Sequence, residues 1–161
     1  MEGLIVSTLG RGGFDNTKRA VYVLLLNQYV YIGVTGASNN TGTSSPHKRL
    51  STHVTKNGST KSAVWDNIFA GSLVSEADLA TRMISIHLDS RLNVNAIEKL
   101  CIYSFQERCE QNVLHNKREK KSPSNLTAEE QEFAEEFVEM IVRERQAWID
   151  SNFGENTEAA V

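Results

Sequence analysis

Five side chains have the types that metal-dependent hydrolysis of a phosphodiester requires. They are Tyr22, Tyr31, Arg49, His53 and Glu98. A carboxylate holds a divalent ion, and a guanidinium forks onto phosphate oxygens. A phenol or an imidazole moves the proton of the attacking water. These residue types raise the hypothesis of a hydrolytic site, provided that the fold brings them together.

The two tyrosines lie on segments that read as paired strands. Residues 20–26 and 29–35 are rich in Val, Leu, Ile and Tyr, and only two polar residues separate them, which predicts a β-hairpin. Residues 83–89 alternate between apolar and polar side chains and predict a half-buried strand. Residues 3–8 are a further β-prone run. An alternative interpretation is that the tyrosines are merely the aromatic residues that strands favour.

The cation and the imidazole share a predicted helix. Ser45 offers an N-cap and Pro46 suits the first helical position. Arg49 and His53, four residues apart, then lie on one face of this helix. The alternative is that this face is simply solvated. A second short helix fits residues 63–70.

The carboxylate lies on a helix predicted over residues 95–109. Asn95 and Glu98 have the spacing of a capping box, so an alternative interpretation of Glu98 is a purely structural one. The core candidates of this helix are Ile97, Leu100, Cys101 and Phe105. Cys101 and Cys109 would lie about 12 Å apart on it, too far for a disulfide. We therefore expect free thiols in a reducing cytoplasm.

A long helix is predicted at the C-terminal end of the chain. Thr127 and Glu130 form a capping box, and the helix runs to about Asn152. Its apolar stripe consists of Phe133, Phe137, Met140, Ile141 and Trp148. We expect this stripe to pack on the body of the protein, with a dimer interface as the alternative.

The order of these pieces resembles the GIY-YIG nuclease family over about residues 18–116. The second family motif is intact as Tyr31-Ile32-Gly33, whereas Ala20-Val21-Tyr22 keeps only the tyrosine of the first. Arg49 and His53 match the family's R-x-x-x-H pattern. Glu98 matches its metal-binding glutamate, and Asn112 sits where the family places a closing asparagine. The small restriction-endonuclease branch is the most similar.

The resemblance implies an α+β fold, with a small three-stranded antiparallel sheet flanked by helices, and the sequence adds a C-terminal amphipathic helix outside the resembling segment. It divides the chain into an N-terminal extension, a nuclease-like domain, a basic linker and an acidic helix with its tail. These are residues 1–17, 18–116, 117–124 and 125–161. We favour a solvated linker for Lys117, Arg118, Lys120 and Lys121, with contacts to DNA phosphate as the alternative. His87 and His115 are predicted to be incidental to the site.

The resemblance also implies a role for each site residue. Tyr22 would be the general base or would position the water, and Tyr31 would support it or contact the phosphate. Glu98 would be the sole protein ligand of one Mg²⁺ or Mn²⁺ ion. Arg49 would stabilise the charge that develops on the phosphate, and His53 would assist proton transfer. The substrate contacts would come from Gly33, Lys48 and Arg49, and the structural brace from Asn112. A phenol titrates near 10, so Tyr22 would need neighbouring positive charge from Lys48, Arg49 or the metal.

DNA is the partner that the resemblance implies, without a small-molecule cofactor and with a homodimer as a plausible assembly. The alternative is a catalytically silent GIY-YIG-like module that binds nucleic acid or protein. No run approaches the roughly 18 apolar residues of a membrane-spanning helix, and the first residues do not read as a secretory signal. We therefore expect a cytoplasmic protein.

Charge is distributed unevenly along the chain, which has 161 residues and a net charge of −3. Residues 1–122 carry 15 basic and 10 acidic side chains, a net +5, and residues 123–161 carry 2 basic and 10 acidic side chains, a net −8. The basic part coincides with the nuclease-like segment. We expect the acidic helix to face away from DNA, with a built-in DNA mimic over Arg49 and His53 as the alternative.

Overall fold

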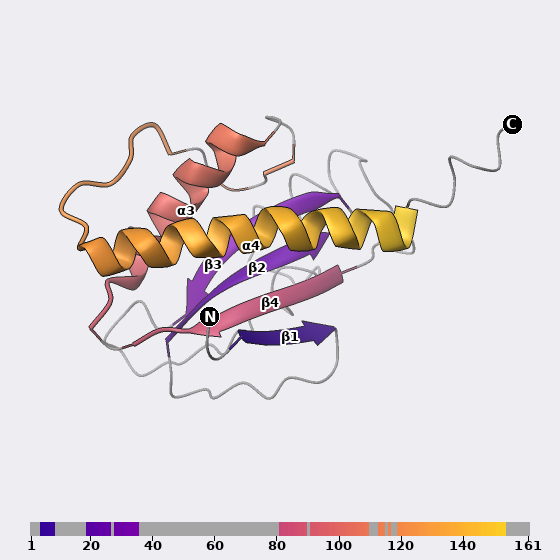
Figure 1. Ribbon diagram of the computed structural model, residues 1–161, viewed down its shortest axis with the longest axis horizontal. Helices are drawn as coiled ribbons and strands as arrows, with labels where there is room; N and C mark the ends of the chain where they lie inside the picture. Colours follow the sequence, from indigo (N-terminus) through magenta and orange to yellow (C-terminus); the bar gives the residue numbers. More distant parts are fainter. Residues whose placement is uncertain are drawn as a thin grey trace, which may run out of the picture.

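Four antiparallel strands form the sheet of the computed structural model, in the order β1-β4-β2-β3 (Figure 1). The strands are β1 (Leu4–Thr8), β2 (Ala20–Leu26), β3 (Tyr29–Thr35) and β4 (Thr81–His87). The helices are α3 (Val94–Arg108) and α4 (Ala128–Phe153). The structure describes residues 4–8, 19–26, 28–35, 81–89, 91–109, 113–114, 116 and 119–153.

The predicted α+β class is confirmed, and the three predicted strands pair as an antiparallel unit with β2 at its centre. β2 and β3 have the predicted bounds. β4 begins and ends two residues earlier than predicted, because Thr81 pairs with Leu26 while Leu88 leaves the ladder and bonds the carbonyl of Arg19. The sheet also has a fourth strand, since β1, from the predicted N-terminal extension, pairs with β4.

One face of the sheet packs against both helices and is called here the helix face. Its buried side chains are Val21, Val23, Leu25, Val30, Ile32, Val34, Ile84 and Ile86. Figure 1 shows α4 running across the strands on this side, with α3 beside it. Ile97, Cys101 and Phe105 of α3 and Phe137 and Ile141 of α4 are buried in the same core.

The start of α3 differs from the predicted one. Asn93, in an extended conformation, is the N-cap, and its side chain accepts a hydrogen bond from the backbone N–H of Ala96 (3.2 Å). The predicted Asn95–Glu98 capping box is therefore wrong, because the helix has already begun when the chain reaches Asn95. Asn93 and Asn95 both carry a side chain that can cap a helix, and the extended backbone of Asn93 makes Asn93 the cap.

The start of α4 is as predicted. The Glu130 N–H donates to Thr127 Oγ1 (3.1 Å) and the Thr127 N–H donates to Glu130 Oε1 (3.0 Å), which completes the capping box. Glu130 Oε2 also accepts from the backbone N–H of Asn93 (2.6 Å). The backbone N–H of Thr127 is the main cause that lowers the pKa of Glu130, with that of Asn93 contributing.

The apolar stripe of α4 packs on the body of the protein, as expected. Phe137, Met140 and Ile141 are buried in the core, while Phe133 and Trp148 are half-buried against it. The rings of Phe133 and Phe137 stack with centroids 6.2 Å apart. Within the described residues, no helix has the length and apolarity to cross a membrane.

Candidate functional site

The opposite face of the sheet is called here the tyrosine face. In a strand, alternate side chains point to opposite faces, and the pairing register fixes which residues share this one. They are Ala20, Tyr22, Leu24, Leu26, Tyr29, Tyr31, Gly33, Thr35, Met83, Ser85 and His87. Both predicted catalytic tyrosines and the predicted substrate-contacting glycine therefore lie on one face.

Tyr22 lies across Gly33. The two residues are directly opposite each other in the β2–β3 ladder, and the phenol is 2% exposed. A Cβ at position 33 would stand 2.5 Å from Cζ of the Tyr22 ring, closer than real side-chain contacts allow. The last residue of the Tyr31-Ile32-Gly33 motif is therefore a glycine because the ring of Tyr22 occupies the space that a side chain would fill.

Tyr31 and Thr35 flank the Tyr22 hydroxyl. Each lies two positions from Gly33 on the same face of β3, about 7 Å along the strand, and the ring of Tyr22 reaches over Gly33 between them. Tyr31 is half-buried. The structure thus brings together Tyr22, Tyr31 and Gly33, as the motif order implied.

A residue that the sequence analysis missed holds this part of β3 in place. The Asn116 side chain donates to the carbonyl of Ile32 (2.6 Å) and accepts from its N–H (2.7 Å). The Val30 N–H bonds the carbonyl of Val113 (2.8 Å), and Val30 forms a parallel bridge with Leu114. Val113, Leu114 and Asn116 therefore lie along the outer edge of β3 and fix the backbone that presents Tyr31 and Gly33.

The predicted brace was Asn112, which lies outside the described residues. The local signal for Asn116 in the sequence is only the short apolar pair Val113-Leu114 before it. The described residues also exclude Lys48, Arg49 and His53. They exclude both short predicted helices, the one that begins at Pro46 and the one over residues 63–70. What the sequence predicts for these residues therefore stays a prediction.

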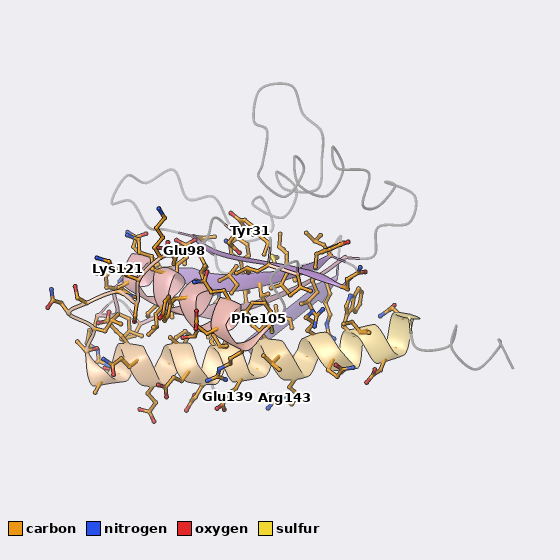
Figure 2. All side chains as sticks on the ribbon, turned by 90° about the horizontal axis from the view of Figure 1, so that it is seen from above. Tyr31, Glu98, Phe105, Lys121, Glu139 and Arg143 are labelled. Atoms are coloured by element: carbon orange, nitrogen blue, oxygen red, sulfur yellow. The ribbon has the colours of Figure 1, made fainter. Side chains whose placement is uncertain are left out.

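Glu98 lies in the second turn of α3 and is half-buried. Because Asn93 caps the helix, Glu98 has no part in a capping box at this end. Figure 2 shows Tyr31 and Glu98 on one side of the molecule, opposite the outer side of α4 where Glu139 and Arg143 lie.

Burial, with the charge of Glu98 adding to it, raises the pKa of the Cys101 thiol far above its usual range. Cys101 and Cys109 are both free.

Glu98 would suit Mg²⁺ only as a single protein ligand, with the other ligands supplied by water and substrate. Among the described residues, no three His, Cys, Asp or Glu side chains gather into a group that could enclose a metal ion. Mg²⁺ keeps several waters and is often held by one or two carboxylates together with substrate phosphates. A single carboxylate, with water and substrate completing the coordination, would suit that ion, whereas a structural zinc site would require more ligands.

Three further polar groups on the tyrosine face were not predicted as site residues. Thr35 Oγ1, Ser85 Oγ and His87 Nε2 are buried, and each is without a hydrogen-bond partner in the part of the chain that the structure describes. Ser85 is directly opposite Tyr22 on β4, and Thr35 and His87 stand on either side of Ala20. Buried polar groups are nearly always satisfied, so a set of such exceptions on one face calls for an explanation.

The chain matches no family model, and neither a curated protein nor a solved structure is significantly similar to it.

Proposed function

We propose that this chain is a metal-dependent endonuclease that hydrolyses DNA phosphodiester bonds, most similar to the small restriction-type GIY-YIG enzymes. The observation that carries the proposal is the placement of the Tyr22 phenol over Gly33, between Tyr31 and Thr35. The position of Glu98 on the same side of the molecule as Tyr31 supports the proposal (Figure 2).

In this proposal, Tyr22 accepts the proton of the attacking water. Gly33 leaves the phenol the space to reach over β3, and Tyr31 orients the water or the scissile phosphate. Asn116 keeps the backbone of Ile32 fixed, so that the residues before and after it hold their positions. Since a phenol titrates near 10, positive charge must lower its pKa, and Lys48 and Arg49 are the candidates from the sequence.

Glu98 would hold the metal ion, with the remaining ligands supplied by water and substrate oxygens. Bound there, Mg²⁺ would stabilise negative charge on the phosphate and on the leaving oxygen. Arg49 would share that task, and His53 would assist proton transfer, as the resemblance implies.

The test is relaxation of a supercoiled plasmid in Mg²⁺ by the wild type, Glu98→Gln and Glu107→Gln. Glu107 is an exposed carboxylate of the same helix, so the two variants change charge and shape equally on α3. We expect Glu98→Gln to lose at least a hundredfold in rate, in line with the effect of removing a key electrostatic group. Glu107→Gln should cut like the wild type, and circular dichroism should show both variants folded.

Equal cutting by Glu98→Gln and the wild type would contradict this assignment of the metal ligand. A wild type that binds DNA but cuts it in neither Mg²⁺ nor Mn²⁺ would support the silent binding module instead. Tyr22→Phe adds a second arm, because it removes the hydroxyl and keeps the ring, and Tyr103→Phe on α3 is its control.

A further inference from the structure

The segment that reads as a basic linker is attached to α3. The Gln106 side chain donates to the carbonyl of Glu119 (2.5 Å) and accepts from the Glu119 N–H (3.2 Å). One side chain of the helix thus binds both the N–H and the carbonyl of the Glu119 backbone, which holds this residue against α3. Residues 119–124 therefore have a fixed place beside α3 (Figure 1).

The far end of the same segment is fixed as well. Asn125 adopts a left-handed conformation (φ 61°), which asparagine tolerates better than most residues. The chain then enters the capping box of α4, where Glu130 bonds the N–H of Asn93 at the start of α3. Both ends of the segment are thus tied to α3, one near its last turns and one at its N-cap.

Between these two attachments lies an open groove of about 520 Å³. Its polar lining includes, besides the N-cap Asn93, the residues Asn95, Lys99, Glu119, Lys121, Ser122 and Ser124. Lys99 stands on the α3 wall and Lys121 on the wall formed by the segment, and both side chains are exposed. With Glu119 as the one carboxylate of the lining, the groove has a net positive charge and several neutral hydrogen-bond donors.

The groove lies at the same end of the molecule as the candidate metal ligand. Lys99 directly follows Glu98 on α3, and Figure 2 shows Lys121 and Glu98 at the same end of the molecule. Glu139, an exposed acidic residue of α4, lies on the opposite side. A DNA backbone held at Glu98 through the metal ion would therefore lie at the end of the molecule where Lys121 stands and away from Glu139.

We propose that this groove binds the sugar–phosphate backbone of duplex DNA next to the scissile phosphate, with Lys99 and Lys121 neutralising phosphates from its two walls. Ser122, Ser124 and Asn95 supply donors of the kind that contact phosphate oxygens without reading sequence. This inference rests on the proposed nuclease function, because that function makes DNA the substrate. It assigns a task to the basic run that the catalytic residues leave unexplained.

The test is the salt dependence of binding to a short fluorescent DNA duplex, measured by anisotropy in EDTA so that no cleavage occurs. The groove variant is Lys99→Gln with Lys121→Gln. The control is Lys120→Gln with Arg143→Gln, which removes two exposed positive charges outside the groove lining. The two variants have the same net charge, so a general electrostatic effect would change both equally.

We expect the groove variant to bind more weakly and to lose about 1 from the slope of log K against log salt for each lysine. The control should keep most of the wild-type slope. In Mg²⁺, the groove variant should need more DNA to reach half its maximal cleavage rate, while its rate at saturating DNA stays close to that of the wild type.

Equal slopes for the groove variant and the wild type would overturn the inference and leave the nuclease proposal standing. The inference would also be overturned, with the nuclease proposal still standing, if the control lost as much slope as the groove variant. A wild type that binds through the groove and never cuts DNA would overturn the nuclease proposal alone. A wild type that does not bind duplex DNA at all would overturn both.

Discussion

The two faces of the central sheet are both buried, yet they differ in what they bury. The helix face holds aliphatic side chains that pack against α3 and α4. The tyrosine face holds the Tyr22 phenol over a glycine, together with Thr35, Ser85 and His87, whose buried polar atoms lack hydrogen-bond partners within the described residues. The burial of a side chain in this sheet therefore does not show whether the side chain serves stability or the proposed reaction. The helix face follows the rules for a stable core, and the tyrosine face departs from them where a site is proposed.

The largest expected effect is on the helix face. Phe137→Ala removes a fully buried ring that stacks on Phe133, and we expect it to lower the free energy of unfolding by about 3–5 kcal/mol. Urea unfolding followed by circular dichroism measures this loss. Val142→Ala, at an exposed position of the same helix, should change stability little. A loss below 1 kcal/mol for Phe137→Ala would contradict the docking of α4 on this face.

Gly33→Ala should have the next largest effect, because the new methyl group would overlap the ring of Tyr22. We expect a loss of about 1–3 kcal/mol, typical of overpacking, together with a loss of DNA cleavage. The sharper measurement is a double-mutant cycle with Tyr22→Ala, which removes the ring. If Gly33→Ala costs the same with and without the ring, the contact between Tyr22 and Gly33 is not its cause.

The cap that fixes the start of α4 predicts a smaller, pH-dependent effect. The bonds to Thr127 and Asn93 lower the pKa of Glu130 below its ordinary value of 4.5. The stabilisation is therefore complete above that value and is lost as the pH falls below it, when the carboxylate takes up a proton. Between neutral and acidic pH, the wild type should lose more free energy of unfolding than Glu130→Gln does. Glu132→Gln, at an exposed position of α4, should follow the wild type.

The smallest expected effect is on the tyrosine face. Ser85→Ala removes a buried hydroxyl without a partner among the described residues, so we expect stability to be unchanged or to rise by up to about 1 kcal/mol. If stability is kept but cleavage falls, the hydroxyl serves the reaction or its substrate. A destabilisation above 1 kcal/mol would show that the hydroxyl is satisfied in solution, and the contrast between the two faces would weaken.

Local patterns in the sequence predicted the local parts of the fold. The bounds of β2 and β3 followed from two apolar runs with a two-residue separation. The Thr127–Glu130 capping box was predicted because all its bonds join neighbouring residues. The start of α3 was missed because Asn93 and Asn95 offer the same side chain, and the backbone of Asn93 decides which one caps.

The missed features depend on partners that are distant in the chain. Asn116 bonds the backbone of Ile32 from 84 residues away, so the short apolar pair before it does not reveal which strand it braces. The pairing of β1 with β4 is equally non-local. At the candidate site, the motif order predicted that Tyr22, Tyr31 and Gly33 meet. The polar exceptions at Thr35, Ser85 and His87 emerge only when the register of three strands is known.

Glu130 gives α3 and α4 a common starting point. One oxygen of its carboxylate closes the cap of α4, and the other bonds the N-cap residue of α3. Fraying at either helix start breaks a bond that the other start shares, so the two ends should open as one cooperative unit. In hydrogen exchange, the first amides of both helices should accordingly show the same opening free energy, although 34 positions separate Val94 from Ala128 in the chain.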